Sequence, residues 1–355
     1  MAYTTIDDPS AHFQTTLYTG SGSSGNAITN SGNSDLKPDW LWIKSRSDTE
    51  QHTLYDSSRG STKRLMADAN NAEYVNSTQG IQSFNTDGFT LGENDQNNKS
   101  SQNCVAWQWV ANGGTTSSNS DGDITSTVQA NTTAGFSIVT FTGNGNNDAT
   151  IGHGLGTTPA MIITKNRDDS VLWRVWHQNL TSTNVLFLDV DFAQTAPSGH
   201  SNGYIKTVGS STYSVYQGNT DTNGVNGSSD DMIAYCFAEK KGYSKFGTYT
   251  GNGNADGAFI YTGFKPAFLI IKNISATQSW WYFDNKRTGA YNGADVRLRA
   301  DRDSTESSGS RVDFLSNGFK WRVNDSVVNA NEEYIYFAFA ESPQVNSKGV
   351  PNNAR

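Results

Sequence analysis

Three short sequence signals recur in the same order three times along the 355 residues of this chain. The first is a strand-like run that ends in a glycine turn, with copies at 17–22, 140–145 and 248–253. The second is a proline followed by an apolar run that ends in lysine, at 38–44, 159–165 and 266–272. The third is a closing run centred on alanine, at 105–107, 233–235 and 337–339. The chain is therefore predicted to contain three diverged copies of one module of about 100 residues.

The spacing inside the copies supports the repeat. The turn glycine and the closing alanine are 86, 91 and 87 residues apart, counted between Gly20 and Ala106, Gly143 and Ala234, and Gly251 and Ala338. Copies one and three share further landmarks, which pair as Asp56 with Asp284, Arg59 with Arg287, Arg64 with Arg297, Asp68 with Asp301, and Gly88 with Gly318. The middle copy has residues 176–178 and 186–189 at two of these positions. It lacks the Gly-Phe pair that begins at Gly88 in copy one and at Gly318 in copy three. We therefore expect one shared fold rather than three equal sites.

Alternation of apolar and polar residues with a period of two dominates inside each copy, as in 136–141 and 334–340. No long segment has the i, i+3, i+4, i+7 apolar stripe of a helix. The 34 glycines, the many Asn, Ser and Thr residues and the 12% aromatic content fit short strands joined by many turns. We predict an all-β fold of three tandem antiparallel β-sandwich domains of jelly-roll type, with few helices.

The repeat sets the expected domain boundaries. Sandwich modules are predicted at 1–112, 134–241 and 242–342, and an extended C-terminal tail at 343–355. Residues 113–133 begin with a Gly, Ser and Thr-rich stretch and are predicted to be a flexible linker, in which 124–128 has the pattern for an added strand. The joint between the second and third modules is only 239–243, so we expect this pair to be held more rigidly than the first.

Charge and hydropathy argue against nucleic acid and membrane partners. The formal net charge is -8 and no run is rich in Lys and Arg, whereas nucleic-acid binding needs clustered cations. No apolar stretch of 18 residues occurs, so membrane insertion is not expected. Asp7 and Asp8 stand where a signal peptide would have a basic stretch and an apolar core. Cys104 and Cys236 fall in different copies and are expected to be buried free thiols.

Four segments resemble a known group of proteins. They are the opening residues 1–6, the block formed by 18–20 and 38–44, the stretch 134–145, and the Ile-Gly-His-Gly-Leu-Gly-x-x-Pro motif at 151–159. They resemble modules in virion structural proteins of marine bacteriophages, especially those that infect cyanobacteria, over nearly the whole chain. The resemblance implies concanavalin-like lectin sandwiches in tail fibres or other surface appendages, on the tail or capsid surface of the virion. It also implies a homotrimer, because phage fibres commonly trimerise.

The chain offers little pattern for catalysis or for a cofactor. Sandwich-fold glucanases carry a Glu-x-Asp-x-x-Glu run, which is missing here, and Glu332 and Glu333 are adjacent strand residues that would face opposite ways. We therefore expect no enzymatic activity and no cofactor. Asp301 and Asp303, with Thr305, have the 1, 3, 5 oxygen spacing of a calcium loop, but the glycine at position 6 and the glutamate at position 12 are missing. This spacing fits either a weak calcium site or a solvated turn.

The positive signal is for a surface that binds sugar or another protein, where flat aromatic rings stack on sugar faces. Trp280, Trp281 and Tyr282 are the best candidates, because two adjacent tryptophans on a strand cannot both face one core. One of them should be exposed or in an interface. Trp321 is a further candidate for the same site, or a core residue.

Three functions follow as hypotheses. The first is a tail-fibre-like virion protein that attaches to host cell-surface glycan or to other virion proteins through its lectin-like modules. The second is a capsid-decoration or adaptor protein that binds no glycan. The third is a polysaccharide depolymerase.

Overall fold

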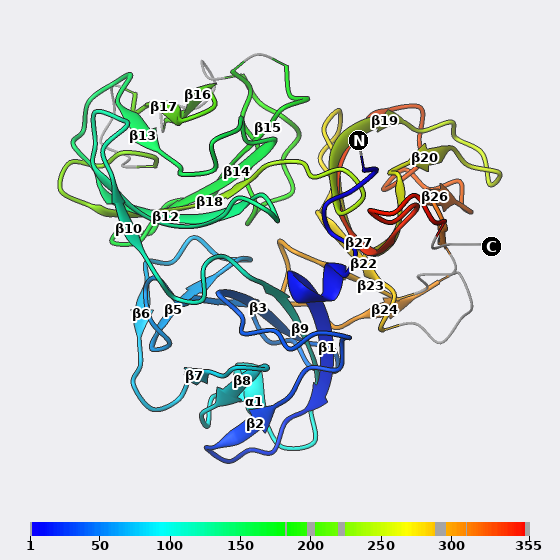
Figure 1. Ribbon diagram of the computed structural model, residues 1–355, viewed down its shortest axis with the longest axis horizontal. Helices are drawn as coiled ribbons and strands as arrows, with labels where there is room; N and C mark the ends of the chain where they lie inside the picture. The colour runs from blue at the N-terminus through cyan, green and yellow to red at the C-terminus, as the bar shows by residue number, and fades with distance from the viewer. Residues whose placement is uncertain are drawn as a thin grey trace.

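The computed structural model describes residues 2–181, 183–196, 203–218, 224–287, 296–309 and 311–351. Over these ranges the regular structure is nearly all β-strand, apart from the short helices η1 (Pro9–Ala11) and α1 (Asp95–Asn98). The strands form six antiparallel sheets, grouped into three units that each pair a six-stranded sheet with a three-stranded one. This confirms the predicted all-β fold of three sandwiches. Figure 1 shows the units as three lobes around a common centre.

Unit 1 contains a six-stranded sheet in the order β1-β9-β3-β4-β5-β6 and a three-stranded sheet in the order β2-β8-β7. Its strands are β1 (Phe13–Thr19), β2 (Asn26–Ile28), β3 (Trp40–Ser45), β4 (Thr53–Asp56), β5 (Lys63–Met66), β6 (Tyr74–Val75), β7 (Ile81–Phe84), β8 (Phe89–Leu91) and β9 (Asn103–Trp109).

Unit 2 has the sheets β10-β11-β12-β18-β14-β15 and β13-β17-β16. Its strands are β10 (Ser117–Asn119), β11 (Ser126–Asn131), β12 (Phe136–Thr142), β13 (Thr150–Gly152), β14 (Met161–Asn166), β15 (Arg174–His177), β16 (Tyr204–Val208), β17 (Thr212–Tyr216) and β18 (Asp231–Phe237). The segment 113–133 contains two of these strands, β10 and β11, which extend the large sheet of unit 2. Gln129 of β11 is fully buried, and its amide donates to Ser57 and Ser58 of unit 1.

Unit 3 has the sheets β19-β27-β21-β22-β23-β24 and β20-β26-β25. Its strands are β19 (Ser244–Thr250), β20 (Phe259–Tyr261), β21 (Phe264–Asn273), β22 (Trp281–Asp284), β23 (Val296–Arg299), β24 (Ser307–Ser308), β25 (Val312–Leu315), β26 (Gly318–Trp321) and β27 (Glu333–Pro343). The tail after β27 returns to the N-terminal segment, where the Ser347 backbone N–H donates to Asp7 over 2.7 Å. Residues 352–355 of the predicted tail lie outside the described residues.

Strand pairing corrects one part of the repeat alignment. Trp109, Phe237 and Phe339 are equivalent, because each pairs with the first residue of β1, β12 or β19. The segment 337–339 therefore corresponds to 107–109 and not to 105–107. A slip of two residues leaves every side chain on its original face, so alternation alone could not detect it.

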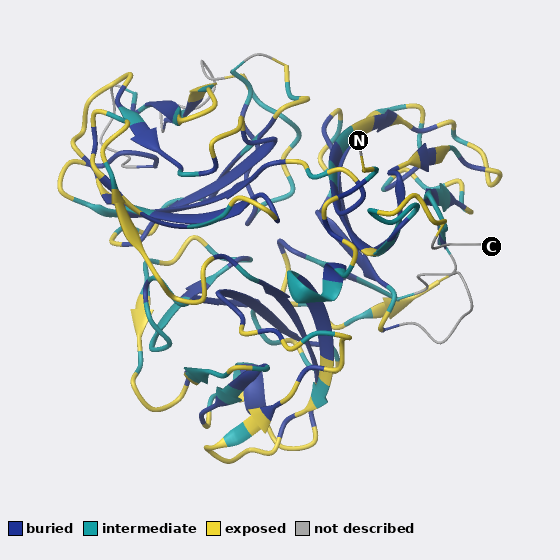
Figure 2. Cartoon of the chain, viewed as in Figure 1, coloured by how far each residue is buried: buried dark blue, intermediate teal, exposed yellow. Residues whose placement is uncertain are grey.

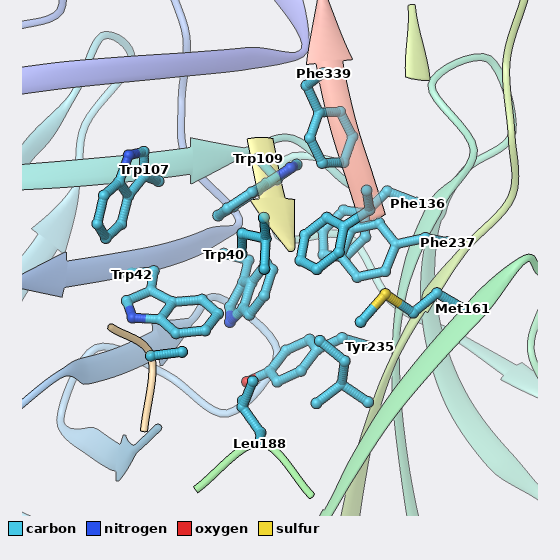
Figure 3. Close-up of a cluster of buried hydrophobic side chains, with 14 of the residues drawn as sticks. Trp40, Trp42, Trp107, Trp109, Phe136, Met161, Leu188, Tyr235, Phe237 and Phe339 are labelled. Carbon is cyan, nitrogen blue, oxygen red and sulfur yellow. The ribbon is translucent and has the colours of Figure 1, made fainter. Parts of the chain in front are cut away.

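The large sheets are buried on both faces. One face of each packs against the small sheet of its own unit and forms a separate core there. The opposite faces of all three large sheets meet in one central core (Figure 3). Its rings join every pair of units, with centroids 4.4 Å apart for Trp40 and Tyr235, 5.7 Å for Trp109 and Phe339, and 6.1 Å for Phe237 and Phe339. Figure 2 shows the buried strands around this centre and exposed residues on the outer loops.

Equivalent contacts close the ring of units, and two of the three contain an indole hydrogen bond. The Trp173 indole of unit 2 donates to the Met66 carbonyl of unit 1 over 2.8 Å. The Trp280 indole of unit 3 donates to the Phe187 carbonyl of unit 2 over 2.7 Å. At the same place in unit 1, His52 is fully buried beside the backbone of Arg299 in unit 3. Each unit therefore contacts the one before it in the same way, and the three units form one body.

The repeated lysine of the second signal has a structural role. Lys44, Lys165 and Lys272 are fully buried at the ends of their strands. Their ammonium groups donate to backbone carbonyls, as in the 2.7 Å bonds from Lys44 to Ser45 and from Lys165 to Asn166. Burial lowers the pKa of each lysine to about 8. The lysine is used to satisfy carbonyl groups where the chain leaves the sheet.

Candidate functional site

The aromatic residues singled out in unit 3 all lie in the interior. Trp280 and Tyr282 belong to the central core, whereas Trp281 and Trp321 belong to the separate core of unit 3. The two adjacent tryptophans thus face two different cores, one of them an interface between units. Trp281, at 8%, is the most exposed of the four. None of the four therefore offers an open ring face on which a sugar could stack.

Asp301 is a structural carboxylate. Its Oδ1 accepts from the Trp280 backbone N–H over 3.1 Å, and its Oδ2 lies 3.7 Å from Nε of Arg302. Asp68 accepts from the His52 N–H in the same way. Burial raises the pKa of Asp301, and Asp303 is exposed. Within the described ranges no group of three or more His, Cys, Asp or Glu side chains is placed to hold a metal ion.

An open concavity on unit 1 is a stronger candidate for a binding site. Its volume is about 320 Å³. It lies where strand β5, the turn after β6 and the N-terminus of α1 come together, and it is lined by Arg64, Gln79, Glu93, Asn94, Asp95 and Gln96. We call this set of residues the unit 1 concavity. An adjoining crevice, with no room for a water molecule, shares Arg64 and Asn94 and has Tyr74 on its wall.

Hydrogen bonds fix the polar groups of the unit 1 concavity. Asn94 caps helix α1, since its side-chain oxygen accepts from the Gln96 N–H over 2.8 Å. The Asn94 N–H donates to the Gln79 carbonyl over 2.9 Å, which ties the helix start to the turn after β6. Arg64 donates to the Gln96 side-chain oxygen over 2.5 Å, and Gln96 in turn donates to Gln51 over 3.3 Å. The lining is therefore ordered before any ligand arrives.

Tyr74 supplies an aromatic ring beside these groups. It is 50% exposed, and the guanidinium carbon of Arg64 lies 4.9 Å from its ring centroid. Strand β6 is a two-residue edge strand, so the tyrosine projects from the rim of the sheet rather than into a core. Sequence reasoning missed this residue because it stands alone in a polar stretch without strand-like alternation. The sequence signal that could have pointed to Tyr74 is a single aromatic residue within a polar stretch.

A second hollow, of about 170 Å³, lies between units 1 and 3. Its walls are mostly polar and include Gln14, Thr15, Asn285, Lys286 and Glu341. Thr15 Oγ1 and Asn285 Oδ1 are buried there without a hydrogen-bond partner among the described residues. The hollow is smaller than the roughly 300 Å³ at which ordinary ligand sites begin, so it suits a few water molecules better than a saccharide.

A family model described as a domain of unknown function, DUF7483, matches residues 8–343. The chain belongs to this family. The DUF7483 match spans all three units, which agrees with their shared central core. No curated protein and no solved structure matched the chain. Among the described residues of this DUF7483 member, no helix is long and apolar enough to span a membrane.

Proposed function

We propose that this protein is a bacteriophage virion protein of tail-fibre type that attaches to host-surface glycan through the unit 1 concavity, without a catalytic step. The observation that carries the proposal is the ordered polar lining of the concavity beside the half-exposed Tyr74 ring. The resemblance to marine phage structural modules supports the virion location and a homotrimer. Other virion proteins are further expected partners.

The chemistry of the unit 1 concavity suits a saccharide. Amide, carboxylate and guanidinium groups can each bond sugar hydroxyls, as donors, acceptors or both. A tyrosine ring stacks on the apolar face of a pyranose and loses little conformational entropy in doing so. A volume of about 320 Å³ has room for one or two sugar rings, at the lower end of known ligand sites. The open shape favours the end or a branch of a glycan chain.

Competition for adsorption tests this proposal. Phage particles and host cells are mixed with increasing amounts of the purified protein, with heat-unfolded protein as the control. If the protein attaches to host glycan, it occupies the receptors and slows adsorption of the particles. The same incubation with host polysaccharide is assayed for new reducing ends, which a depolymerase would release and a binding protein would not. No competition, or release of reducing ends, overturns the proposal.

A second candidate function is capsid decoration or an adaptor role without glycan binding. The observation that favours it is an exposed aromatic pair on β20 of unit 3, where Phe259 and Tyr261 are 46% and 53% exposed. The two residues lie on the same face of the strand, and exposed apolar patches of this kind often mark protein contacts. Antibody labelling of intact particles distinguishes the candidates, because a decoration protein would cover the capsid and a fibre protein would mark the tail.

A further inference from the structure

Unit 3 gathers arginine side chains around one tryptophan. Strand β22 pairs with β23 so that Arg299 lies directly opposite Trp281, with Arg297 on the same face two residues away. The guanidinium carbons of Arg297 and Arg299 lie 4.2 and 5.5 Å from the centroid of the Trp281 ring. Both cations therefore lie over the aromatic ring that sequence analysis selected.

A third arginine completes the cluster. Arg311 donates to Asp325, and the same carboxylate oxygen lies 4.0 Å from Nη1 of Arg297. The Arg297 and Arg311 side chains are each only 16% exposed. We call Arg297, Arg299 and Arg311 the unit 3 arginine cluster. Asp325 is the one carboxylate that the structure pairs with this cluster among the described residues, so the charges do not balance.

Three acidic side chains elsewhere on this unit are engaged with other cations. Asp313 pairs with Arg322 and Asp256 with Lys320 on the small sheet. Glu306 accepts two hydrogen bonds of 2.8 Å from Arg46 of unit 1. The excess positive charge of the arginine cluster is therefore local, on a chain whose formal net charge is -8.

Several donors of the cluster are buried without an acceptor. Among the described residues, Nη1 of Arg297, Nε of Arg311 and Nε1 of Trp281 have no hydrogen-bond partner. A buried donor that gives up water without gaining an acceptor destabilises the fold, and more so when it is charged. Burial, together with the neighbouring Arg311 and Arg299, lowers the pKa of Arg297 to about 10. The site thus has buried donors that the carboxylate of Asp325 does not satisfy.

The cluster is particular to unit 3. Strand register makes Leu65, Leu186 and Leu298 equivalent, so the position of Arg297 is held by Arg64 in unit 1 and by Val185 in unit 2. Among the described residues Arg64 forms no ion pair, and it donates to the side chain of Gln96 in a lining rich in amides. The equivalent positions of Arg64 in unit 1 and Arg297 in unit 3 therefore favour different ligands.

We propose that the unit 3 arginine cluster binds the carboxylate or sulfate group of an acidic polysaccharide. This inference rests on the proposed function, since it names a class of glycan for the same protein. The guanidinium fork matches the paired oxygens of either oxyanion. A neutral sugar has no open ring face here, because Trp281 is 8% exposed and covered by guanidinium groups.

Binding to three soluble polymers tests the proposal. Polygalacturonate supplies carboxylates, dextran sulfate supplies sulfates, and dextran is the neutral control. The wild-type chain is expected to bind at least one of the two acidic polymers and not dextran at this site. Arg297→Gln and Arg311→Gln should each weaken that binding by about tenfold or more, since each removes a charge-assisted bond. Which acidic polymer binds decides between carboxylate and sulfate.

Matched variants keep the result interpretable. Arg322→Gln removes an exposed arginine of the same unit that is already paired with Asp313, so it should leave binding unchanged. Arg297→Lys keeps the charge but loses the fork and should recover only part of the affinity. Thermal melting of each variant checks folding, and a rise in the wild-type melting temperature with the acidic polymer supplies a readout that needs no variant. Tyr74→Ala should leave acidic-polymer binding intact, which separates this site from the unit 1 concavity.

Two outcomes overturn the proposal. One is that neither acidic polymer binds the wild-type chain or raises its melting temperature. The other is that binding survives in folded Arg297→Gln and Arg311→Gln proteins, or falls equally in Arg322→Gln. If the wild-type protein binds an acidic polymer but does not compete with phage particles for adsorption, the result counts against the proposed attachment role. The anion site is then still supported.

Discussion

The indole of Trp107 in unit 1 donates a 3.1 Å hydrogen bond to the carboxylate of Asp284 in unit 3, 177 residues away. Tyr235 of unit 2 makes the corresponding bond, of 2.7 Å, to Asp56 of unit 1. Both carboxylates also hold a buried arginine three residues later in the chain. Two of the landmark pairs shared by copies one and three, Asp56 with Asp284 and Arg59 with Arg287, therefore lie at contacts between units.

A shared core predicts that the three units unfold together. Trp280→Ala removes a fully buried ring from the central core and its bond to Phe187, which should cost about 3–5 kcal/mol. Urea unfolding followed by tryptophan fluorescence and by far-ultraviolet circular dichroism should then show one transition, shifted as a whole. Phe259→Ala, on an exposed ring of the same unit, should change stability by about 0.5 kcal/mol or less. Separate transitions, with only one of them shifted, would contradict the shared core.

The contact between units 1 and 2 should weaken in acid because of Glu73. Its carboxylate accepts from Arg167 over 2.8 and 2.9 Å and from Arg59 over 2.8 Å. Desolvation acts to raise the Glu73 pKa, but these arginines outweigh it and lower the pKa to about 2. The folded pKa lies below the unfolded value, so the stabilisation is complete above about pH 4.5 and is lost as the pH falls toward 2. Its full size is about 3 kcal/mol.

The measurement is the free energy of unfolding between pH 2 and 7 for the wild type and Glu73→Gln. The gap between the two proteins should be widest near neutral pH and narrow steadily below pH 4.5. Glu341→Gln, which removes an exposed partner of Lys265, should follow the wild-type curve at all pH values. A gap that does not change with pH would show that the Glu73 charge does not hold this contact.

Calcium should not stabilise the chain through Asp301 and Asp303. Asp301 is engaged by the Trp280 N–H and lies beside Arg302, so a cation would have to compete with both. The melting temperature should be the same in millimolar calcium and in chelator. A rise in calcium that Asp303→Asn removes would restore the calcium-loop hypothesis.

The sequence predicts much of the fold for a clear physical reason. Copies of one module keep their turn glycines and strand patterns, because Gly20, for instance, packs so closely on the Lys99 carbonyl that a Cβ would come within 2.2 Å. The central core is harder to foresee. All six residues of β3 are buried, so alternation does not tell which face meets the small sheet and which meets the other units. Trp40 and Trp42 do share a face, but the partner across it comes from another copy.

The candidate site was less predictable than the fold. Trp280 and Trp281 look like binding residues because adjacent residues of an extended run point to opposite faces, and only the assembled units show that both faces are covered. Tyr74 and the amides around α1 have no shared motif and no neighbouring tryptophan that would mark them as a binding surface. Arg297 was recognised as a repeat landmark, but its excess charge emerges only when Arg299 and Arg311 are brought beside it.

Glycan-array binding tests the attachment proposal most directly. Wild-type protein, Tyr74→Ala and Phe259→Ala are applied to the same array at high valency, after thermal melting has shown that all three are folded. The account predicts that the wild type and Phe259→Ala bind the same glycans, and that Tyr74→Ala loses about tenfold or more in affinity for those held by stacking. Absence of binding by the wild type, or binding of uncharged glycans that Tyr74→Ala leaves unchanged, would contradict it.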